Sequence, residues 1–162
     1  MSMTAIIPVR AGSRRVPHKN IRTFAGTSLL KIKINQLQRI PAVDTILVSS
    51  DSDVMLELAR TLGVEAKHRP AEFCDEKSRT FNDLVEYVVE NDVCTDDVIW
   101  TPCVCPLVRD RTIIEGIEMY EKIKRHEIEY DSLVSTIRFK EYLFDDYGKT
   151  VNFSVENLFR LR

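Results

Sequence analysis

A group of cationic side chains follows the first apolar run of this chain. The run at residues 5–9 leads into a turn whose basic residues are Arg10, Arg14, Arg15, His18, Lys19 and Arg22. A guanidinium group can bind two phosphate oxygens through parallel N–H bonds, and a lysine adds a compact, mobile charge. These residue types suit a polyanionic ligand, and a triphosphate is the natural candidate.

Charge is distributed unevenly along the chain. Residues 1–43 contain eight Lys and Arg residues and no Asp or Glu, whereas the other residues contain 15 basic and 25 acidic side chains. The asymmetry predicts a positive site at one end of the first strand, where an anion would be concentrated. Nucleic-acid binding is disfavoured, because the basic residues share one turn without interleaved aromatic residues and the rest is acidic.

The glycine of the basic turn fits a phosphate-binding loop, although two known glycine motifs are absent. We expect Gly12 to allow a tight turn and to bring backbone N–H groups close to phosphate oxygens. A Walker A motif would need Gly-Lys-Ser/Thr where Pro17-His18-Lys19 stands, and a dinucleotide fingerprint would need glycines closer than Gly26. From charge alone, a phosphate loop and a solvated basic turn are equally acceptable.

Length and composition indicate one globular domain. The chain has 162 residues, with 44% apolar and 30% charged side chains. It contains no signal-like apolar segment and no run of 18 apolar residues, so we expect a cytoplasmic protein without membrane contact. Cys103-Val104-Cys105 could be half of a zinc site, but a second pair at suitable spacing is missing, which favours small buried side chains.

Strand-length apolar runs alternate with segments of helical periodicity. The pattern predicts strands near residues 4–9, 45–49, 64–66, 98–100 and 132–136, and helices near 28–39, 52–62, 80–90 and 111–125. This order predicts an α/β fold with three layers, a mostly parallel, Rossmann-like sheet between helices. Ligands bind such sheets at the carboxyl ends of the strands, so we expect the basic turn to share one rim with residues 49–51, 69–70 and 101–109.

Helix ends and helix faces can also be assigned. Leu30, Ile34 and Leu37 form the core face of the first helix. For the second helix we expect Val54, Leu58 and Leu62 inside and Gly63 just past the end. Thr80 is expected to cap the third helix. Asp51 or Ser52 can cap the second, and for Asp51 a capping role is favoured over ligand binding.

The exact string at residues 8–20 resembles the nucleotide-binding signature of the acylneuraminate cytidylyltransferases. The family pattern is Pro-Ala-Arg-x-Gly-Ser-Lys-x-Ile-Pro-x-Lys-Asn, from which this chain differs by Val9, Arg14 and Val16. Further similarity extends over essentially the whole chain, at residues 26–30, 48–52, 69–73 and 106–109. Members of this family activate sialic and related nonulosonic acids, or KDO in a sister branch, with CTP.

The resemblance implies the fold of nucleotide-diphospho-sugar transferases and a set of site residues. It implies Arg10 and Lys19 as catalytic groups that bind the triphosphate with Asn20, and Gly12 and Ser13 as backbone donors. Arg69 and Thr80 would face the cytidine, and Thr101 and Arg109 the sugar acid, although Arg109 could equally be a surface arginine. The implied cofactor is Mg²⁺, and the implied assembly is a homodimer.

The chain departs from the family pattern in two places. Residues 101–107 stand where the family has Gln-Pro-Thr-Ser-Pro-Leu, with an extra residue and no Gln, which leaves the identity of the sugar acid open. We expect one nucleotidyltransferase domain over residues 1–162, with a dimer or substrate arm that begins at 151–162 and is cut short, so the metal ligands are not identifiable. The alternatives are a non-catalytic nucleotide-binding module and a nucleotidyltransferase for another sugar such as KDO.

Overall fold

Within the part of the chain that the structure describes, the fold consists of four parallel strands and four α-helices. The computed structural model describes residues 2–13, 15–75, 77–136 and 143–151. The strands are β1 (Met3–Pro8), β2 (Thr45–Ser50), β3 (Glu65–His68) and β4 (Asp97–Trp100), in the sheet order β3-β2-β1-β4. The helices are α1 (Leu29–Leu37), α2 (Asp53–Thr61), α3 (Phe81–Asp92), α4 (Asp110–Lys124) and the 3₁₀ turn η1 (Ala71–Phe73).

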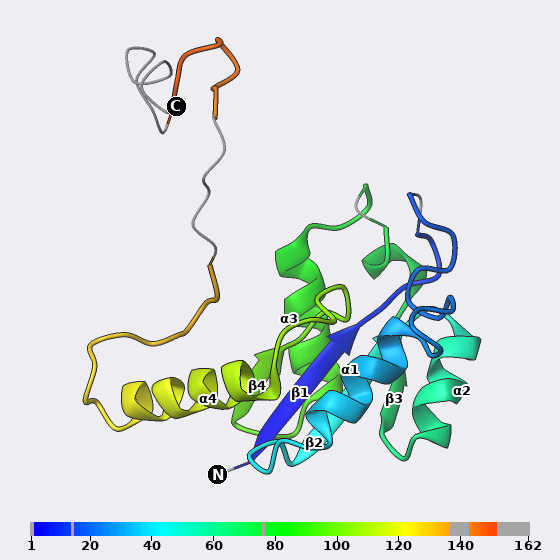
Figure 1. Ribbon diagram of the computed structural model, residues 1–162, viewed down its shortest axis with the longest axis horizontal. Helices are drawn as coiled ribbons and strands as arrows, with labels where there is room; N and C mark the ends of the chain where they lie inside the picture. Colours follow the sequence, from blue (N-terminus) through cyan, green and yellow to red (C-terminus); the bar gives the residue numbers. More distant parts are fainter. Residues whose placement is uncertain (1, 14, 76, 137–142, 152–162) are drawn as a thin grey trace.

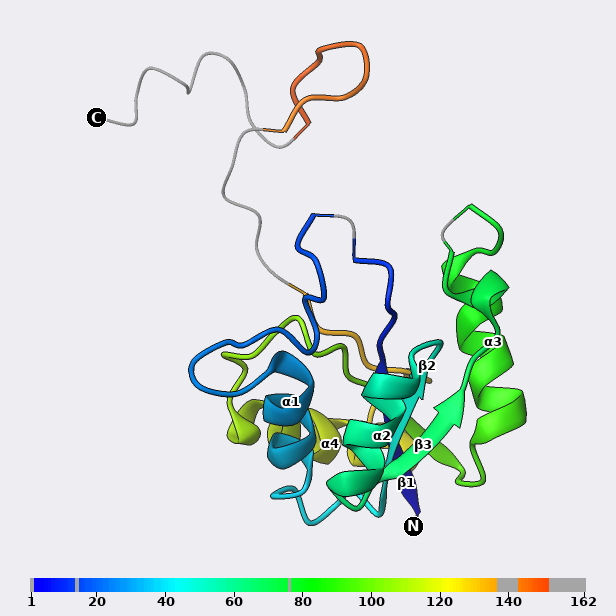
Figure 2. The same ribbon diagram turned by 90° about the vertical axis from the view of Figure 1, so that its right-hand side faces the viewer.

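The helices cover both faces of the sheet, which confirms the predicted three layers. Figure 2 shows α1, α2 and α4 on one side of the strands and α3 on the other. The larger core cluster joins β1 to α1, α2 and α4 through residues such as Ile7, Leu30 and Ile117. The smaller cluster joins Ile6 and Leu47 of the sheet to Val88 of α3. The basic turn rises from the carboxyl end of β1 (Figure 1).

The expected helix faces and caps are largely present. Leu30, Ile34 and Leu37 of α1 are fully buried, as expected. Ser28, expected as the first residue of this helix, is instead its cap, and its side chain accepts from the N–H of Lys31. Gly63 follows α2 with a φ of 72°, as a residue just past a helix end commonly does. Thr80 caps α3 through a reciprocal box, in which the side chain and backbone of Asp83 bond back to it.

The predicted core face of α2 was wrong at Val54, which is 65% exposed. The buried residues are instead Met55, Leu56 and Ala59, while Leu58 and Leu62 pack at the margin of the core. Apolar residues spaced by four occur on two adjacent stripes of this helix, so periodicity alone permits either orientation. Packing against β2 and β3 selects the stripe that begins at Met55.

The predicted strand at residues 132–136 is absent. These residues are exposed and carry no strand pairing, and Leu133 and Val134 are 50% and 81% exposed. Alternating apolar residues make a segment suitable for a strand, but a strand forms only where a neighbouring edge pairs with it. Residues 137–142 and 152–162 lie outside the described part, so the predicted arm and the single-domain assignment stay predictions.

Polar contacts fix α4 against the rest of the fold. Both carboxylate oxygens of the buried Asp97 at the start of β4 accept from Nζ of Lys124, at 2.8 and 2.6 Å, and the hydroxyl of Tyr120 donates to one of them at 3.2 Å. At the other end of the helix, the guanidinium of Arg39 binds both oxygens of Asp110. The loop between β4 and α4 is therefore held between two anchored elements.

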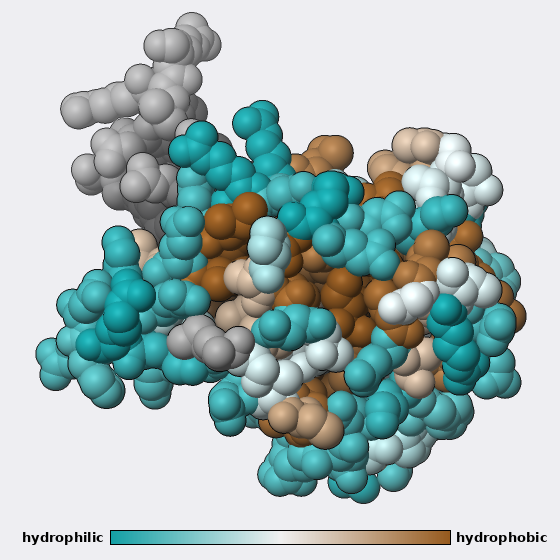
Figure 3. All heavy atoms as spheres, turned by 90° about the horizontal axis from the view of Figure 1, so that it is seen from below, coloured by the Kyte–Doolittle hydropathy of each residue, from teal (hydrophilic) through white to brown (hydrophobic). Residues whose placement is uncertain are grey.

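The two ends of the sheet differ in character. Seen from below, apolar side chains gather in the middle of the face and hydrophilic side chains surround them (Figure 3). The cationic turn lies at the other end, where β1 ends. No helix in the described part of the chain is long and apolar enough to cross a membrane.

Candidate functional site

The carboxyl ends of the strands bring the predicted loops together at one rim. We call residues 10–22 the basic loop. The N–H of Ala11 in this loop donates to Oδ1 of Asp51, which follows β2, at 2.9 Å. The prediction that Asp51 is favoured as a helix cap was therefore wrong. The cap of α2 is Ser52, without a side-chain bond, because the Asp51 carboxylate is turned towards the basic loop.

Arg10 connects the basic loop to the segment that follows η1. Its Nη1 donates to the carbonyl oxygen of Cys74 at 2.7 Å, and the residue is half-buried. Lys19 is also half-buried, and it follows His18, whose φ of 51° turns the loop back towards the sheet. The structure thus places both predicted catalytic cations near the carboxyl end of β1.

Asn20 is buried and joins three elements. Its Nδ2 donates to the carbonyl oxygen of Arg10 at 3.5 Å, and its Oδ1 accepts from Sγ of Cys103 at 3.2 Å. Its backbone carbonyl accepts from the N–H of Leu30 at the start of α1. The contact with Cys103 was missed by sequence reasoning, because the two residues are 83 positions apart.

Gly12 and Ser13 are the two predicted backbone donors of the basic loop, and Gly12 is exposed. The N–H of Ser13 is used within the loop, where it donates to the carbonyl oxygen of Ala11 at 2.9 Å. Gly12 does not adopt the left-handed conformation, and a Cβ atom placed there would meet no atom within 4 Å. The turn itself therefore does not need a glycine, contrary to our expectation. Close approach of a ligand to this backbone stays a prediction.

Arg69 lies beneath the basic loop and is only 2% exposed. Its Nη2 donates to the carbonyl oxygen of Val9 at 2.8 Å and its Nη1 to that of Ser49 at 3.2 Å, while Nε reaches Sγ of Cys74 at 3.1 Å. The guanidinium therefore ties together the ends of β1 and β2 and the turn after η1. A direct contact with cytidine, predicted from the family resemblance, is untested and would require these bonds to change.

The other three predicted site residues lie in different settings. Thr80 is exposed and uses its hydroxyl as a helix cap, on the α3 side of the sheet. Thr101 is buried, and its N–H and hydroxyl both donate to the carbonyl oxygen of Ile6. Arg109 is exposed at the start of α4, and no bond of its side chain is found within the described residues. Of the three, Arg109 offers the most accessible polar group.

Burial shifts the pKa of two thiols, those of Cys74 and Cys103, and of Lys33. Burial raises the pKa of the Cys103 thiol to about 11, against the opposing charges of Lys19 and Lys33. Burial also raises the pKa of Cys74, although its bond from Arg69 acts in the opposite direction. The pKa of Lys33 is lowered by burial. Both thiols are therefore protonated at neutral pH and serve as hydrogen-bonding groups rather than nucleophiles.

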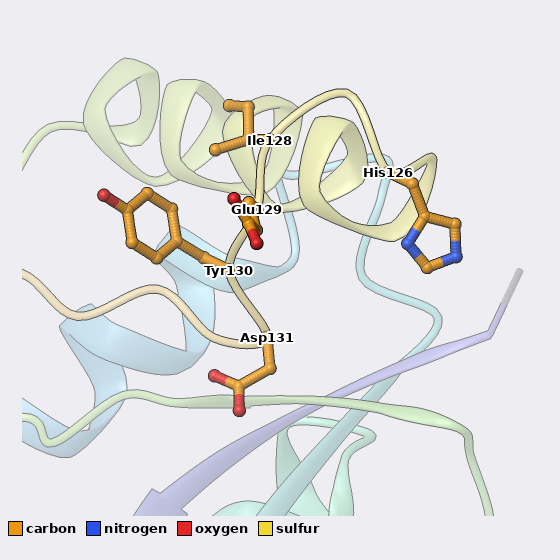
Figure 4. Close-up of a pocket in the computed structure, with 5 residues that line it drawn as sticks. All are labelled: His126, Ile128, Glu129, Tyr130 and Asp131. Carbon is orange, nitrogen blue, oxygen red and sulfur yellow. The ribbon is translucent and has the colours of Figure 1, made fainter.

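A cavity of about 540 Å³ lies away from the rim, at the carboxyl end of α4. It is lined by the consecutive residues His126, Ile128, Glu129, Tyr130 and Asp131. Figure 4 shows the His126, Tyr130 and Asp131 side chains pointing in different directions, so the lining does not converge on a ligand. Among the residues that the structure describes, no group of three His, Cys, Asp or Glu side chains is arranged to hold a metal ion.

Comparison with known proteins identifies the family. The model of the cytidylyltransferase family matches residues 4–158. The chain belongs to the cytidylyltransferase family. This membership confirms the resemblance found in the sequence. The matched region contains the basic loop, Asp51, Arg69 and the loop before α4.

Relatives of this cytidylyltransferase-family chain include enzymes of nonulosonic acid activation. It is 30% identical over 125 residues to the CMP-N,N'-diacetyllegionaminic acid synthase of Legionella pneumophila, an alignment covering 75% of this chain and 54% of that one. It is 28% identical over 123 residues to the N-acylneuraminate cytidylyltransferase of Oncorhynchus mykiss, covering 74% and 28%. The chain thus spans about half the length of the first relative and less of the second.

Solved structures confirm the fold. A CMP:2-keto-3-deoxy-manno-octonic acid synthetase complexed with CTP is similar with a TM-score of 0.60 at 18% identity, covering 75% of this chain and 48% of that one. The 4-diphosphocytidyl-2C-methyl-D-erythritol synthase of Anaerococcus prevotii gives 0.64 at 15% identity, covering 92% and 62%. The sheet between two layers of helices, with the basic loop after β1, is therefore a nucleotidyltransferase fold.

Proposed function

We propose that the basic loop binds the triphosphate of CTP and that the protein transfers the cytidylyl group to a nonulosonic, sialic-acid-like sugar acid. The observation that carries the proposal is the position of Arg10 and Lys19 at the carboxyl end of β1, in a chain of the cytidylyltransferase family. The relatives from Legionella pneumophila and Oncorhynchus mykiss supply the class of sugar acid.

In the proposed reaction, the oxygen of the sugar acid's anomeric hydroxyl attacks the α-phosphorus of CTP. The bond from that phosphorus to the bridging oxygen breaks, and pyrophosphate leaves with the bonding electrons while the hydroxyl loses its proton to solvent. Arg10 and Lys19 would stabilise the negative charge that builds on the phosphate oxygens, and the N–H of Gly12 would add a neutral donor. No covalent intermediate with the protein is needed.

Mg²⁺ is the proposed cofactor, and its chemistry would be to neutralise and orient the phosphates. The described residues fit such an ion only partly, since they include no group of three protein ligands. The carboxylate of Asp51 is the acidic group joined to the basic loop at the rim. Mg²⁺ commonly binds through one or two carboxylates together with substrate phosphates, which this arrangement permits.

The remaining ligand assignments follow the family resemblance. We propose Asn20, Ser13, Arg69 and Thr80 for the nucleotide, and Thr101 and Arg109 for the sugar acid. Because Asn20, Arg69 and Thr101 already bond to protein groups inside the fold, they would support the site from beneath. A homodimer and a cytoplasmic location are also proposed, and sedimentation of the purified protein would test the first.

Two measurements test the function. CTP should raise the melting temperature more than ATP does, and Arg10→Ala or Lys19→Ala should remove most of the increase. Pyrophosphate release from CTP should then appear with a sialic-type acid and be weaker with KDO. Binding of CTP without turnover of any acid would support a nucleotide-binding module instead. If neither nucleotide changes the melting temperature, the basic loop is not a triphosphate site.

A further inference from the structure

The loop that joins β4 to α4, residues 101–109, is fixed at both ends. At its start, the N–H and the hydroxyl of Thr101 donate to the carbonyl oxygen of Ile6, at 2.8 and 2.9 Å. Near its end, Nε2 of Gln36 in α1 donates to the carbonyl oxygen of Val108 at 2.5 Å. Contacts that this loop makes between those points are therefore held in a defined place.

One such contact comes from the thiol of Cys103. The residue is 2% exposed, and its Sγ lies 3.2 Å from Oδ1 of Asn20. An amide oxygen can only accept, so the thiol is the donor. Because burial raises the pKa of this thiol to about 11, it keeps its proton at neutral pH. The contact thus persists over the range in which most enzymes work.

The amide of Asn20 connects Cys103 to the backbone of the basic loop. With Oδ1 bound to the thiol, Nδ2 is directed at the carbonyl oxygen of Arg10, 3.5 Å away. Asn20 is 5% exposed, so water offers its side chain little alternative. Loss of the thiol would leave a buried acceptor unpaired and would free the amide to turn, which would remove one of the contacts that hold the backbone of Arg10.

We propose that Cys103 is a positioning residue for the nucleotide site, which holds Arg10 in place through the amide of Asn20. The proposal rests on the proposed function, since CTP is taken as the ligand of Arg10. It implies that a buried side chain of the loop between β4 and α4 controls the affinity for CTP without touching the nucleotide. Preorganisation of a binding group raises affinity because less freedom is lost on binding.

The test measures the dissociation constant of CTP by calorimetry in the full chain and its variants. Cys103→Ala should weaken binding about two- to tenfold, the range expected for one lost hydrogen bond. Cys103→Ser should retain most of the affinity, because a hydroxyl also donates. Cys105→Ala is the matched control, since this exposed thiol lies two residues away on the same loop, and it should leave the affinity unchanged.

A double-mutant cycle with Asn20→Ala separates positioning from general loosening of the fold. If the thiol acts through Asn20, Cys103→Ala should have no further effect on CTP affinity in the Asn20→Ala background. Additive effects, or a Cys103→Ala variant that binds CTP like the wild type, would overturn the inference while leaving the proposed function intact. A wild-type chain that binds no CTP would overturn both.

Discussion

Single residues of the basic loop are bonded to neighbouring segments of the protein. The N–H of Ala11 donates to Asp51, and Arg10 donates to the carbonyl oxygen of Cys74. A phosphate oxygen would take over from one of these acceptors, so binding exchanges one hydrogen bond for another and does not order a free loop. These bonds therefore hold the proposed nucleotide site in a defined shape.

Gly12 allows a direct test of ligand approach. Gly12→Ala should change the free energy of unfolding by less than about 0.5 kcal/mol, because an added Cβ meets no atom within 4 Å and φ is not positive. If a phosphate lies against this backbone, the methyl group should weaken CTP binding about tenfold or more. Melting curves with and without CTP measure both effects. Unchanged CTP binding would show that the ligand does not approach Gly12.

Arg69 should matter for folding as well as for binding. Arg69→Lys keeps the charge, but a single ammonium cannot reach the carbonyl oxygens of Val9 and Ser49 and the sulfur of Cys74 together. We expect the free energy of unfolding in urea to fall by about 2 kcal/mol. A variant with wild-type stability that no longer binds CTP would instead assign Arg69 to direct nucleotide contact.

Asp92 at the end of α3 has an unpaired carboxylate oxygen, Oδ2, in the described structure. Burial raises the pKa of Asp92, although Lys67 and Arg69 counteract this increase. Because the pKa is raised in the folded state, the protonated carboxyl favours folding. This contribution is complete below the unfolded pKa, about 3.9, and is lost as the pH rises through the higher folded pKa.

Asp92→Asn should therefore stabilise the protein at neutral pH. We expect about 0.5 kcal/mol, a small value because the residue is partly solvated. The gain should disappear near pH 3, where the wild-type carboxyl is protonated too. Urea unfolding at several pH values measures it, and an equal gain at every pH would rule out the charge as its cause.

At the scale of secondary structure elements, local signals predicted most of the fold. Thr80 as a capping residue and Gly63 past a helix end act on backbone within a few positions, so the sequence around them specifies them. The burial of Val54 and the pairing of residues 132–136 depend on which surfaces meet in three dimensions. Those two expectations failed because the intrinsic preference of a segment for helix or strand does not specify which other element packs against it.

The site shows the same division. The order of residues in the basic loop predicted Arg10 and Lys19 at the end of β1, where the structure has them. The role of Asp51 and the contact between Cys103 and Asn20 arise from loops that are far apart in the sequence. A carboxylate before a helix is most often a cap, and only the parallel register of β1 and β2 turns this one towards the loop.

The anchoring of α4 to β4 gives a prediction for these elements. Asp97→Ala should lower the melting temperature on the order of 5 °C, because Asp97 is buried and bonds to Lys124 and Tyr120. Arg125→Ala, which removes two exposed ion pairs at the end of the same helix, is the control and should have little effect. Equal effects of the two substitutions on thermal unfolding would show that the Asp97 contacts do not stabilise the fold.

The pKa of Lys124 is raised by its hydrogen bond to Asp97. Stability from this pair should therefore be complete below the unfolded lysine pKa, about 10.4, and be lost as the pH rises through the higher folded value. The difference in melting temperature between wild type and Asp97→Ala should shrink only in strongly alkaline buffer. A difference that already vanishes near pH 8 would mean that another contact of Asp97 matters more.

At the scale of the whole molecule, positive and negative side chains are unevenly distributed, although the net charge is small. The formal net charge is only −2, yet the first 43 residues carry eight basic side chains and no acidic one. The parallel sheet places the end of β1, with Arg10 and Lys19, at the rim where the loops from β2 and β4 also emerge. An anionic nucleotide would therefore be attracted to this rim although the chain as a whole is slightly acidic.

This field should make CTP binding sensitive to salt. Between roughly 0.05 and 0.5 M NaCl the dissociation constant should rise about tenfold, because screening shortens the reach of the exposed charges. Arg10→Ala should bind more weakly and with a smaller salt dependence. Arg60→Ala, which removes a cation paired with Glu57 on the outer surface of α2, should keep the wild-type dependence. If the wild type and both variants show the same salt dependence of CTP affinity, the attraction does not come from the charges at the rim.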